Sequence, residues 1–398
     1  MSESYGQCGQ PQGLLKWDAP AADNSVNGSD TVTPIGKQPI DFPGSDLRSL
    51  GTIMGRDIAK PSLVVRVALP DDLEGLYQLA LVAGPGMTNL QADRAVLAEK
   101  LAASADAVTS AAAREAGAPI LLVVENGEDQ QVVGTACIFP RVGVTWPFYS
   151  YRITRQTRAS HALGKRVSHD ILNLANDFDG AAEVGGLFIL PSVRGQAAGR
   201  LIARARYMFL AAHRDWFGPQ VISELRGVQD DSGESPVWDS LGRRFYDMDF
   251  AEADRTNALT GNQFIVDLGP RHPIYVSLLS EVAQAALGKP HQHGRPAMQL
   301  LLEEGFRFEG YVDIFDGGPT LFADIDDLAA VKNSRAGQVS GLSDTTYLET
   351  DLICAGHGPD FRCAKGSFSE TGDGLHLNRS LADALNLHVG DEVRHVRF

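Results

Sequence analysis

The sequence RGQAAG at residues 194–199 combines residue types that favour the binding of a bulky anion. It follows a short apolar run that stops at Pro191, and it opens a helical pattern that we expect to continue to about Phe217. The first turn of a helix carries unpaired N–H groups and roughly half a positive charge, so it attracts anions. The small residues leave room for an anion to reach the backbone, and Arg194 and Arg200 add positive charge. A pyrophosphate is the ligand best suited to this turn.

Three known devices place a pyrophosphate on a turn of this kind. A Walker loop needs GxxxxGK[ST], which the chain lacks. A Rossmann turn needs GxGxxG, which RGQAAG does not match. The third device is the acyl-CoA loop of the GNAT superfamily, R-G-x-G-x-[GA] after a strand. RGQAAG resembles that loop, with Ala197 in place of the usual second glycine. An ordinary strand-to-helix turn explains the six residues alone equally well.

Carboxylates on predicted strands are the candidates for binding a cationic substrate. Glu183 and Glu224 fall within two central strands, where an unpaired buried carboxylate is costly. Each therefore faces a ligand, faces solvent, or pairs with an arginine such as Arg152 or Arg226. Further candidates of the same kind, beside a Gly-Gly-Pro turn, are Asp313 and Asp316.

Two residues suit proton transfer to a leaving group. His272 precedes Pro273, and its imidazole titrates near neutral pH, so it can act as a general acid. The alternative is a loop histidine that helps to start the next helix. Tyr246 is the rival acid, and its alternative is a core aromatic within FYDMDF. His291 and His293 are interpreted as polar loop residues and not as metal ligands, because too few further ligands are evident.

The bulk properties limit the classes of function. The chain has 398 residues and a formal net charge of −15, which argues against nucleic-acid binding because phosphate contacts need a basic surface. No apolar run approaches membrane-spanning length, and the N-terminus lacks a secretory pattern, so a cytoplasmic location without membrane contact is expected. The four cysteines, Cys8, Cys137, Cys354 and Cys363, are expected to be reduced thiols, and no metal site is expected.

The elements that would position these residues follow from the apolar patterns. Residues 1–60 are rich in Gly, Pro, Ser and Asn and predict a flexible tail. The patterns predict strands at 63–69, 146–153, 183–190, 221–227 and 262–268, with a hairpin at 119–139. They predict one helix that begins at residue 70 and further helices at 91–103, 194–217, 235–248, 274–287 and 296–304. The stretch 306–325 is rich in strand residues. Short strands from about 337 predict a small β domain that ends in a barrel-like segment.

Three long stretches resemble one family, the arginine N-succinyltransferases of bacterial arginine catabolism. They lie at 222–250 (ISELRGVQDDSGESPVWDSLGRRFYDMDF), 270–275 (PRHPIY) and 305–320 (GFRFEGYVDIFDGGPT). The resemblance covers residues 62–335 and is weaker beyond them. Two short segments depart from the family: EVGGLFI at 183–189, where the family reads ELCTLFL, and TNLQ at 88–91, where it reads TSLP. Both positions suit a substrate pocket, so the donor and acceptor stay open.

The resemblance implies an α+β, GNAT-like acyl-CoA N-acyltransferase fold, with a central mixed sheet flanked by helices and a small C-terminal β domain. It implies a tail at 1–60, an acyl-CoA-binding domain at 61–270, an extension completing the active site at 271–335, and a β-rich domain at 336–398. The implied reaction moves a succinyl group from succinyl-CoA to the α-amine of L-arginine, without a bound cofactor. The alternatives are another acyl-CoA or amine, such as acetyl-CoA or ornithine, and a silent acyl-CoA-binding subunit.

The resemblance also assigns roles to residues. His272, the histidine of the HPIY motif, is implied as the proton donor. The expected acyl-CoA contacts are Leu187, Phe188, Ile189, Arg194, Gly195, Gln196, Ala197, Gly199 and Arg200. The expected substrate-binding residues are Glu183, Glu224, Arg152 and Asp316. A homo-oligomer or a hetero-oligomer of related subunits is expected as well.

Overall fold

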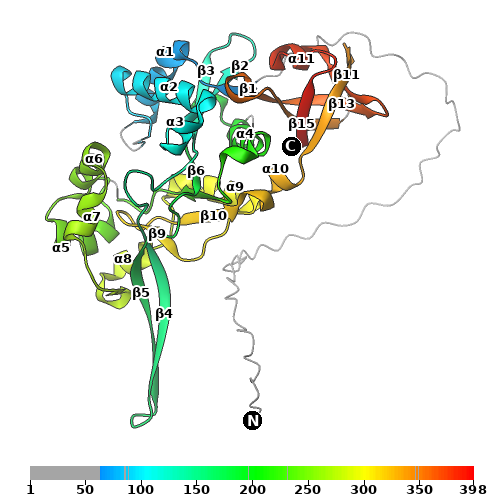
Figure 1. Ribbon diagram of the computed structural model, residues 1–398. Helices are drawn as coiled ribbons and strands as arrows, with labels where there is room; N and C mark the ends of the chain where they lie inside the picture. The colour runs from blue at the N-terminus through cyan, green and yellow to red at the C-terminus, as the bar shows by residue number, and fades with distance from the viewer. Residues whose placement is uncertain are drawn as a thin grey trace, which may run out of the picture. The chain divides into compact units, whose positions relative to one another are not determined.

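Six strands form the part of the sheet that carries the predicted site. The computed structural model describes residues 63–398 except 85, 86, 88, 196, 231, 346 and 348, together with the backbone alone of 258–260 and 349 (Figure 1). The expected tail at 1–60 lies outside this range. The strands run in the order β10-β7-β6-β3-β2-β1, and only β6 and β7 are parallel. Their bounds are β1 Leu63–Val67, β2 Ile120–Asn126, β3 Val132–Phe139, β6 Ala182–Ile189, β7 Gln220–Glu224 and β10 Thr320–Asp324.

Helices cover both faces of this sheet, which explains why β2 is apolar at successive positions. Ile120, Leu122 and Val124 pack on one face with α4 (Ala198–Ala212), α9 (Arg295–Glu304) and α10 (Ala329–Lys332). Leu121 and Val123 pack on the other face with α1 (Leu73–Ala83) and α2 (Arg94–Thr109), which α3 (Ala111–Glu115) follows. Successive side chains of a strand point to opposite faces, so a strand covered on both faces loses its polar alternation. The expected α+β fold is confirmed.

The C-terminal strands close on themselves, and the barrel expected there is confirmed. The order continues from β1 as β13-β12-β15-β11-β14, and β14 also pairs with β13. Leu381 and Leu385 of α11 (Arg379–Leu385) pack into the barrel core. Because β1 pairs with β13, the barrel continues the main sheet. The domain boundaries stay predictions. The strands are β11 Arg335–Ser343, β12 Glu349–Ala355, β13 Arg362–Thr371, β14 Gly374–Asn378 and β15 Glu392–Arg397.

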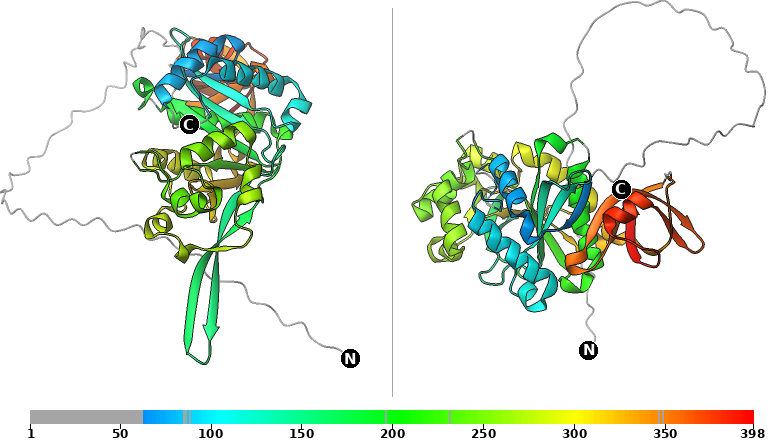
Figure 2. Two further views of the ribbon diagram at one scale, coloured as in Figure 1. Left: turned by 90° about the vertical axis from the view of Figure 1, so that its left-hand side faces the viewer. Right: turned by 90° about the horizontal axis from the view of Figure 1, so that it is seen from above.

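A second sheet has the order β8-β5-β4-β9, with β4 at Ser150–Ser160, β5 at Lys165–Ala175, β8 at Ile274–Tyr275 and β9 at Tyr311–Asp313. The partners β8 and β9 reach only the base of the β4–β5 hairpin. Residues 154–170 therefore form a two-stranded ribbon, which we call the β4–β5 arm. It extends away from the neighbouring helices (Figures 1 and 2). The sequence patterns missed β5, because an arm exposed on both faces has no apolar alternation.

The stretch 262–268 is a helix, so the strand predicted there is wrong. Helix α7 (Gln263–Leu268) follows α5 (Arg243–Tyr246) and α6 (Phe250–Thr260), and Ile265 packs in the core of these short helices. A short apolar run does not distinguish a strand from a buried helix. In this segment, packing against the neighbouring helices stabilises the helical conformation. The helix predicted at 274–287 is shorter, at Glu281–Ala286 (α8). No described helix is both long enough and apolar enough to cross a membrane.

Candidate functional site

Strand β6 contains a bulge in the middle of the predicted site. Its pairing with β3 runs regularly to Gly185, opposite Cys137, and resumes at Phe188, opposite Thr135. Two residues of β6 therefore face one residue of β3. Gly186 has φ 57°, a left-handed conformation that favours glycine. Because a bulge disrupts the regular ladder, Gly186 and Leu187 lie at the one irregular point in the pairing of β6 with β3. This fits the expected role of Leu187.

The other edge of β6 is open beyond its first residues. Only Ala182 and Glu183 pair with β7, although β6 runs to Ile189. The hydroxyl of Ser223 on β7 donates to the Val184 carbonyl at 2.9 Å, and no described strand pairs with this edge further along. An extended ligand can add to a free strand edge through main-chain hydrogen bonds. The edge formed by residues 184–189 is therefore the candidate track for a pantetheine arm.

The turn after β6 has the conformation that an anion site needs. Gly195 has φ 92° and Ala197 has φ 59°, and α4 begins at Ala198 without a side-chain cap. A Cβ added at Gly195 or Gly199 would meet no atom within 4 Å, so the approach to the first turn is open. The left-handed conformation costs alanine roughly 1–2 kcal/mol, which explains why the usual loop has glycine at the position of Ala197. Gln196 lies outside the described residues.

Arg194 and Arg200, the two arginines of the turn, have different partners. The Nε of Arg194 donates to the Ile189 carbonyl at 3.3 Å, and its guanidinium lies 5.9 Å from the centre of the Phe188 ring. Arg200 forms an ion pair with Glu303 of α9 at 3.6 Å, and about half of its side chain is exposed. Both arginines can reorient toward a phosphate, because exposed pairs of this kind contribute little to stability.

Four acidic residues, which we call the carboxylate cluster, lie near the start of β6 and the ends of β7 and β9: Glu183, Glu224, Asp313 and Asp316. Because Glu183 pairs with Ile222, Glu183 and Glu224 point to the same face of the sheet. Burial raises the pKa of both Glu183 and Asp313 to about 7. Burial, with Asp313 and Glu183 nearby, raises the pKa of Glu224 well above its ordinary value. Within the described part of the chain, none of the four forms an ion pair.

The four carboxylates differ in how far the protein already satisfies them. Asp316 is buried and accepts backbone N–H groups of Gly227 and Gly318 at 2.7 and 2.8 Å. Asp313 accepts two N–H groups of its own turn, each at 2.8 Å. Among the described residues, Glu224 accepts a hydrogen bond from the Thr320 hydroxyl alone, at 3.1 Å. Glu183 accepts no hydrogen bond from any described residue. Glu183 and Glu224 are therefore the carboxylates free to bind a ligand, and Asp316 is better placed to hold the turn.

The glycines of β6 make room for the Glu183 carboxylate. A Cβ built on Gly185 would lie 3.3 Å from Oε1 of Glu183 and 3.9 Å from the Phe139 ring. Gly185 therefore leaves open the space beside the Glu183 carboxylate that a side chain would fill. Phe139 also lines a pocket of about 320 Å³ with the loop 141–146 and Asn262.

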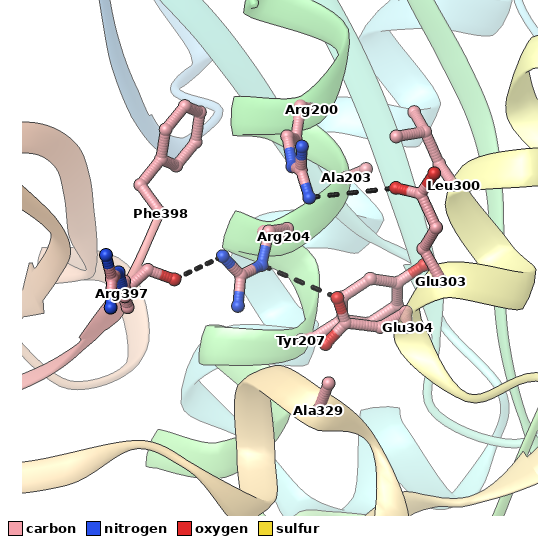
Figure 3. Close-up of a pocket in the computed structure, with 10 residues that line it drawn as sticks. All are labelled: Arg200, Ala203, Arg204, Tyr207, Leu300, Glu303, Glu304, Ala329, Arg397 and Phe398. Carbon is pink, nitrogen blue, oxygen red and sulfur yellow. Dashed lines mark hydrogen bonds and ion pairs between the residues drawn. The ribbon is translucent and has the colours of Figure 1, made fainter.

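A second pocket, of about 230 Å³, lies on the outer side of α4 (Figure 3). It is lined by residues of α4, α9 and the C-terminus, and Figure 3 shows the pairs Arg200–Glu303 and Arg204–Glu304 across it. No member of the carboxylate cluster contributes to its lining. Its charged side chains form ion pairs with one another, whereas the buried Tyr207 hydroxyl has no hydrogen-bond partner among the described residues.

The remaining predicted residues lie outside these contacts. His272 is exposed in the loop between α7 and β8 and makes no hydrogen bond or ion pair with a described residue. The structure therefore does not bring it into contact with the cluster, and its role stays a prediction. Arg152 is half exposed, pairs with Asp177 at 3.7 Å, and lies over the Tyr311 ring. No described group of His, Cys, Asp and Glu residues can hold a metal.

Tyr246 fits its alternative interpretation as a core aromatic. Its ring stacks on Trp238 with centres 5.2 Å apart, and its hydroxyl donates to the Ile265 carbonyl at 3.2 Å. Burial raises its pKa to about 12. A hydroxyl that is committed to a backbone carbonyl is a poor proton shuttle, so His272 stays ahead of Tyr246 as the candidate acid.

Sequence reasoning missed Arg206. This residue of α4 is buried, and its Nη1 donates to the Gly185 carbonyl at the bulge. The signal was present, since Arg206 lies four residues after Ile202 and three before Phe209, on the apolar stripe of the helix. A charged residue on such a stripe needs a specific reason.

Comparisons with known proteins give a consistent result. The profile described as arginine N-succinyltransferase beta subunit matches residues 63–330, and the profile of that subunit's C-terminal domain matches residues 336–397. The arginine N-succinyltransferases of Shigella flexneri and Citrobacter koseri are each 37% identical to the chain over 338 residues, which are 84% of the chain and 98% of each relative. The structure of arginine/ornithine succinyltransferase subunit AI from Pseudomonas aeruginosa matches with a TM-score of 0.75 and 30% identity, covering 85% of this chain and 99% of that chain.

Proposed function

The chain belongs to the arginine N-succinyltransferase family and is an acyltransferase, and on this premise we propose that it transfers a succinyl group from succinyl-CoA to the α-amine of L-arginine. The observation that carries the proposal is the unpaired carboxylate cluster beside the bulged and open edge of β6. An anion turn, a free strand edge and a set of carboxylates are what an acyl-CoA and a dicationic amine require.

The acyl-CoA would lie along β6 and the start of α4. Its pyrophosphate would accept N–H groups from the first turn of α4, with Arg194 and Arg200 adding charge. Its pantetheine arm would pair with the edge at 187–189, which places the thioester at the bulge. There the N–H of Leu187 would bind the carbonyl oxygen as negative charge develops. Such a donor typically contributes roughly 3–4 kcal/mol to lowering the barrier.

L-Arginine would bind at the carboxylate cluster. Glu224 would pair with the guanidinium, and Arg152 would pair with the substrate carboxylate. Glu183, on the same strand as the bulge, would receive a proton from the α-ammonium group. With a pKa raised to about 7 by burial, Glu183 is matched to that transfer near neutral pH. The free amine would then attack the thioester carbon, and the C–S bond would break as the thiolate of CoA leaves. His272 would donate the proton to this thiolate.

The test is the release of free thiol from succinyl-CoA with L-arginine, L-ornithine or L-citrulline as acceptor. We expect release with arginine and at least about a hundredfold lower kcat/KM with citrulline, because its uncharged head leaves buried carboxylates unpaired. Faster release with ornithine would reassign the acceptor, and faster turnover of acetyl-CoA would reassign the donor. Saturable binding of CoA without turnover on any amine would sink the proposal and favour a silent acyl-CoA-binding subunit.

We also propose that the chain forms a dimer through the β4–β5 arm. The arm carries four basic residues and one acidic residue in a chain whose formal net charge is −15, so an acidic surface of a second copy is the matching partner. A two-stranded ribbon alone is marginally stable in water. We expect Arg158→Glu with Arg166→Glu to halve the mass measured by sedimentation equilibrium, while Arg335→Glu on β11 leaves it unchanged. A wild-type chain that sediments as a monomer, or a mass unaffected by the arm variant, contradicts this role.

A further inference from the structure

Two buried arginines lie two positions apart on α4 and differ in their partners. Arg204 is 8% exposed and Arg206 is 4% exposed. Arg204 forms an ion pair with Glu304 at 3.4 Å and donates to the carbonyl of Arg397 (Figure 3). Arg206 forms no ion pair with any described residue. The helix therefore contains one buried cation with an anionic partner and one without.

The bonding of Arg206 is far short of its capacity. A guanidinium has five N–H donors. Arg206 donates one long hydrogen bond, 3.4 Å, from Nη1 to the Gly185 carbonyl, and burial lowers its pKa although the neighbouring Tyr207 and Cys137 side chains partly offset this. Its Nε is fully buried without a partner. The Tyr207 ring centre, 5.7 Å away, offers at most a weak cation–π contact. Keeping a charge buried in this state is costly, because its lost hydration is not replaced.

The position of Arg206 identifies the kind of anion that would complete it. The Gly185 carbonyl immediately precedes the bulge, where the thioester would lie under the proposed function. An acyl group bound there extends from the bulge past this carbonyl. A dicarboxylic acyl group ends in a carboxylate, the anion that a guanidinium pairs with through two parallel bonds. An acetyl group carries no charge to offer.

We propose that Arg206 binds the terminal carboxylate of the acyl group and thereby selects a dicarboxylic acyl-CoA over a neutral one. This inference rests on the proposed function, and it assigns donor selectivity to one side chain. Arg204, which has its own carboxylate, has no such role.

The experiment compares kcat/KM for succinyl-CoA with that for butyryl-CoA, which has the same four carbons and no second carboxylate. We expect Arg206→Met to lower the succinyl preference about a hundredfold or more, mainly through KM, because truncating one member of a buried charge pair has effects of this size. Activity with butyryl-CoA should hold or rise. Arg206→Lys should restore part of the preference. Arg204→Met, the matched control, should lower the melting temperature and leave the preference unchanged.

Each outcome decides a separate point. A wild-type enzyme that does not prefer succinyl-CoA overturns the proposed donor. A wild-type preference that survives in folded Arg206→Met overturns the role of Arg206 and leaves the donor intact. If Arg206→Met does not fold, the comparison passes to Arg206→Lys and to wild-type thermal shifts without an amine. Succinyl-CoA must then raise the melting temperature more than butyryl-CoA does in the wild type, and this difference must shrink in Arg206→Lys, or the inference fails.

Discussion

Replacing Glu183 with glutamine is expected to lower kcat/KM by roughly a hundredfold or more, the usual contribution of a positioned general base. Burial raises the pKa of Glu183 to about 7, so below this pH the side chain is protonated and cannot accept the proton of the α-ammonium group. In the wild type, kcat/KM should therefore rise about tenfold per pH unit up to about pH 7 and then level off. In Glu183→Gln the rise of kcat/KM with pH below pH 7, which we call the acidic limb of the profile, should be absent.

A pH–rate profile from pH 5.5 to 8.5 checks this expectation. Glu128→Gln is the matched control, since Glu128 is an exposed glutamate in the turn between β2 and β3. The control should keep the wild-type profile. A Glu183→Gln enzyme that retains the acidic limb would move the base to another member of the carboxylate cluster, and Glu224→Gln is then the next variant to measure.

The same substitution should stabilise the folded protein above pH 7. A carboxylate whose folded-state pKa is raised above its unfolded value favours folding fully below the unfolded value, near 4.5, and loses this contribution as the pH rises through about 7. Glutamine does not titrate, so Glu183→Gln should gain about 2–3 kcal/mol in unfolding free energy at pH 8 relative to pH 4.5. Urea denaturation at the two pH values measures this difference. Equal effects at both values would contradict a raised pKa.

The anion turn and the two strand glutamates were predictable because their signals are local. A turn of small residues between an apolar strand and an amphipathic helix is specified locally, and the structure has positive φ angles at Gly195 and Ala197 of this turn. Glu183 and Glu224 stood out because each interrupts an apolar strand. A residue type that is costly at its position indicates a site without any knowledge of the fold.

The features that the sequence did not reveal depend on distant pairings. The bulge at Gly186 exists because β3 is one residue short opposite β6, and nothing within EVGGLFI specifies that register. The closure of the C-terminal barrel depends on β14 pairing with both β11 and β13. The sequence shows Arg206 as a charged residue on the apolar stripe of a helix. Whether it has an anionic partner depends on every element that packs around it, and the sequence does not show those neighbours. Such properties require the packed structure.

Replacing His272 with alanine is expected to lower kcat by roughly a hundred- to ten-thousandfold while KM for both substrates stays within about twofold. The reason is the thiolate of CoA, which is a better leaving group when a proton is supplied as the C–S bond breaks. His272 is exposed and makes no hydrogen bond with a described residue, so the truncation removes no internal contact. The unfolding free energy should therefore change by less than about 0.5 kcal/mol.

This combination separates chemistry from structure. A lost kcat with an unchanged urea midpoint assigns the effect to proton donation. Tyr246→Phe gives the contrast, because it removes the hydrogen bond to the Ile265 carbonyl and should lower stability by about 1 kcal/mol with little effect on kcat. If His272→Ala keeps more than half of the wild-type kcat, the thiolate leaves without a protein acid. His272 would then be a loop residue without a catalytic role, which is the alternative interpretation given from the sequence.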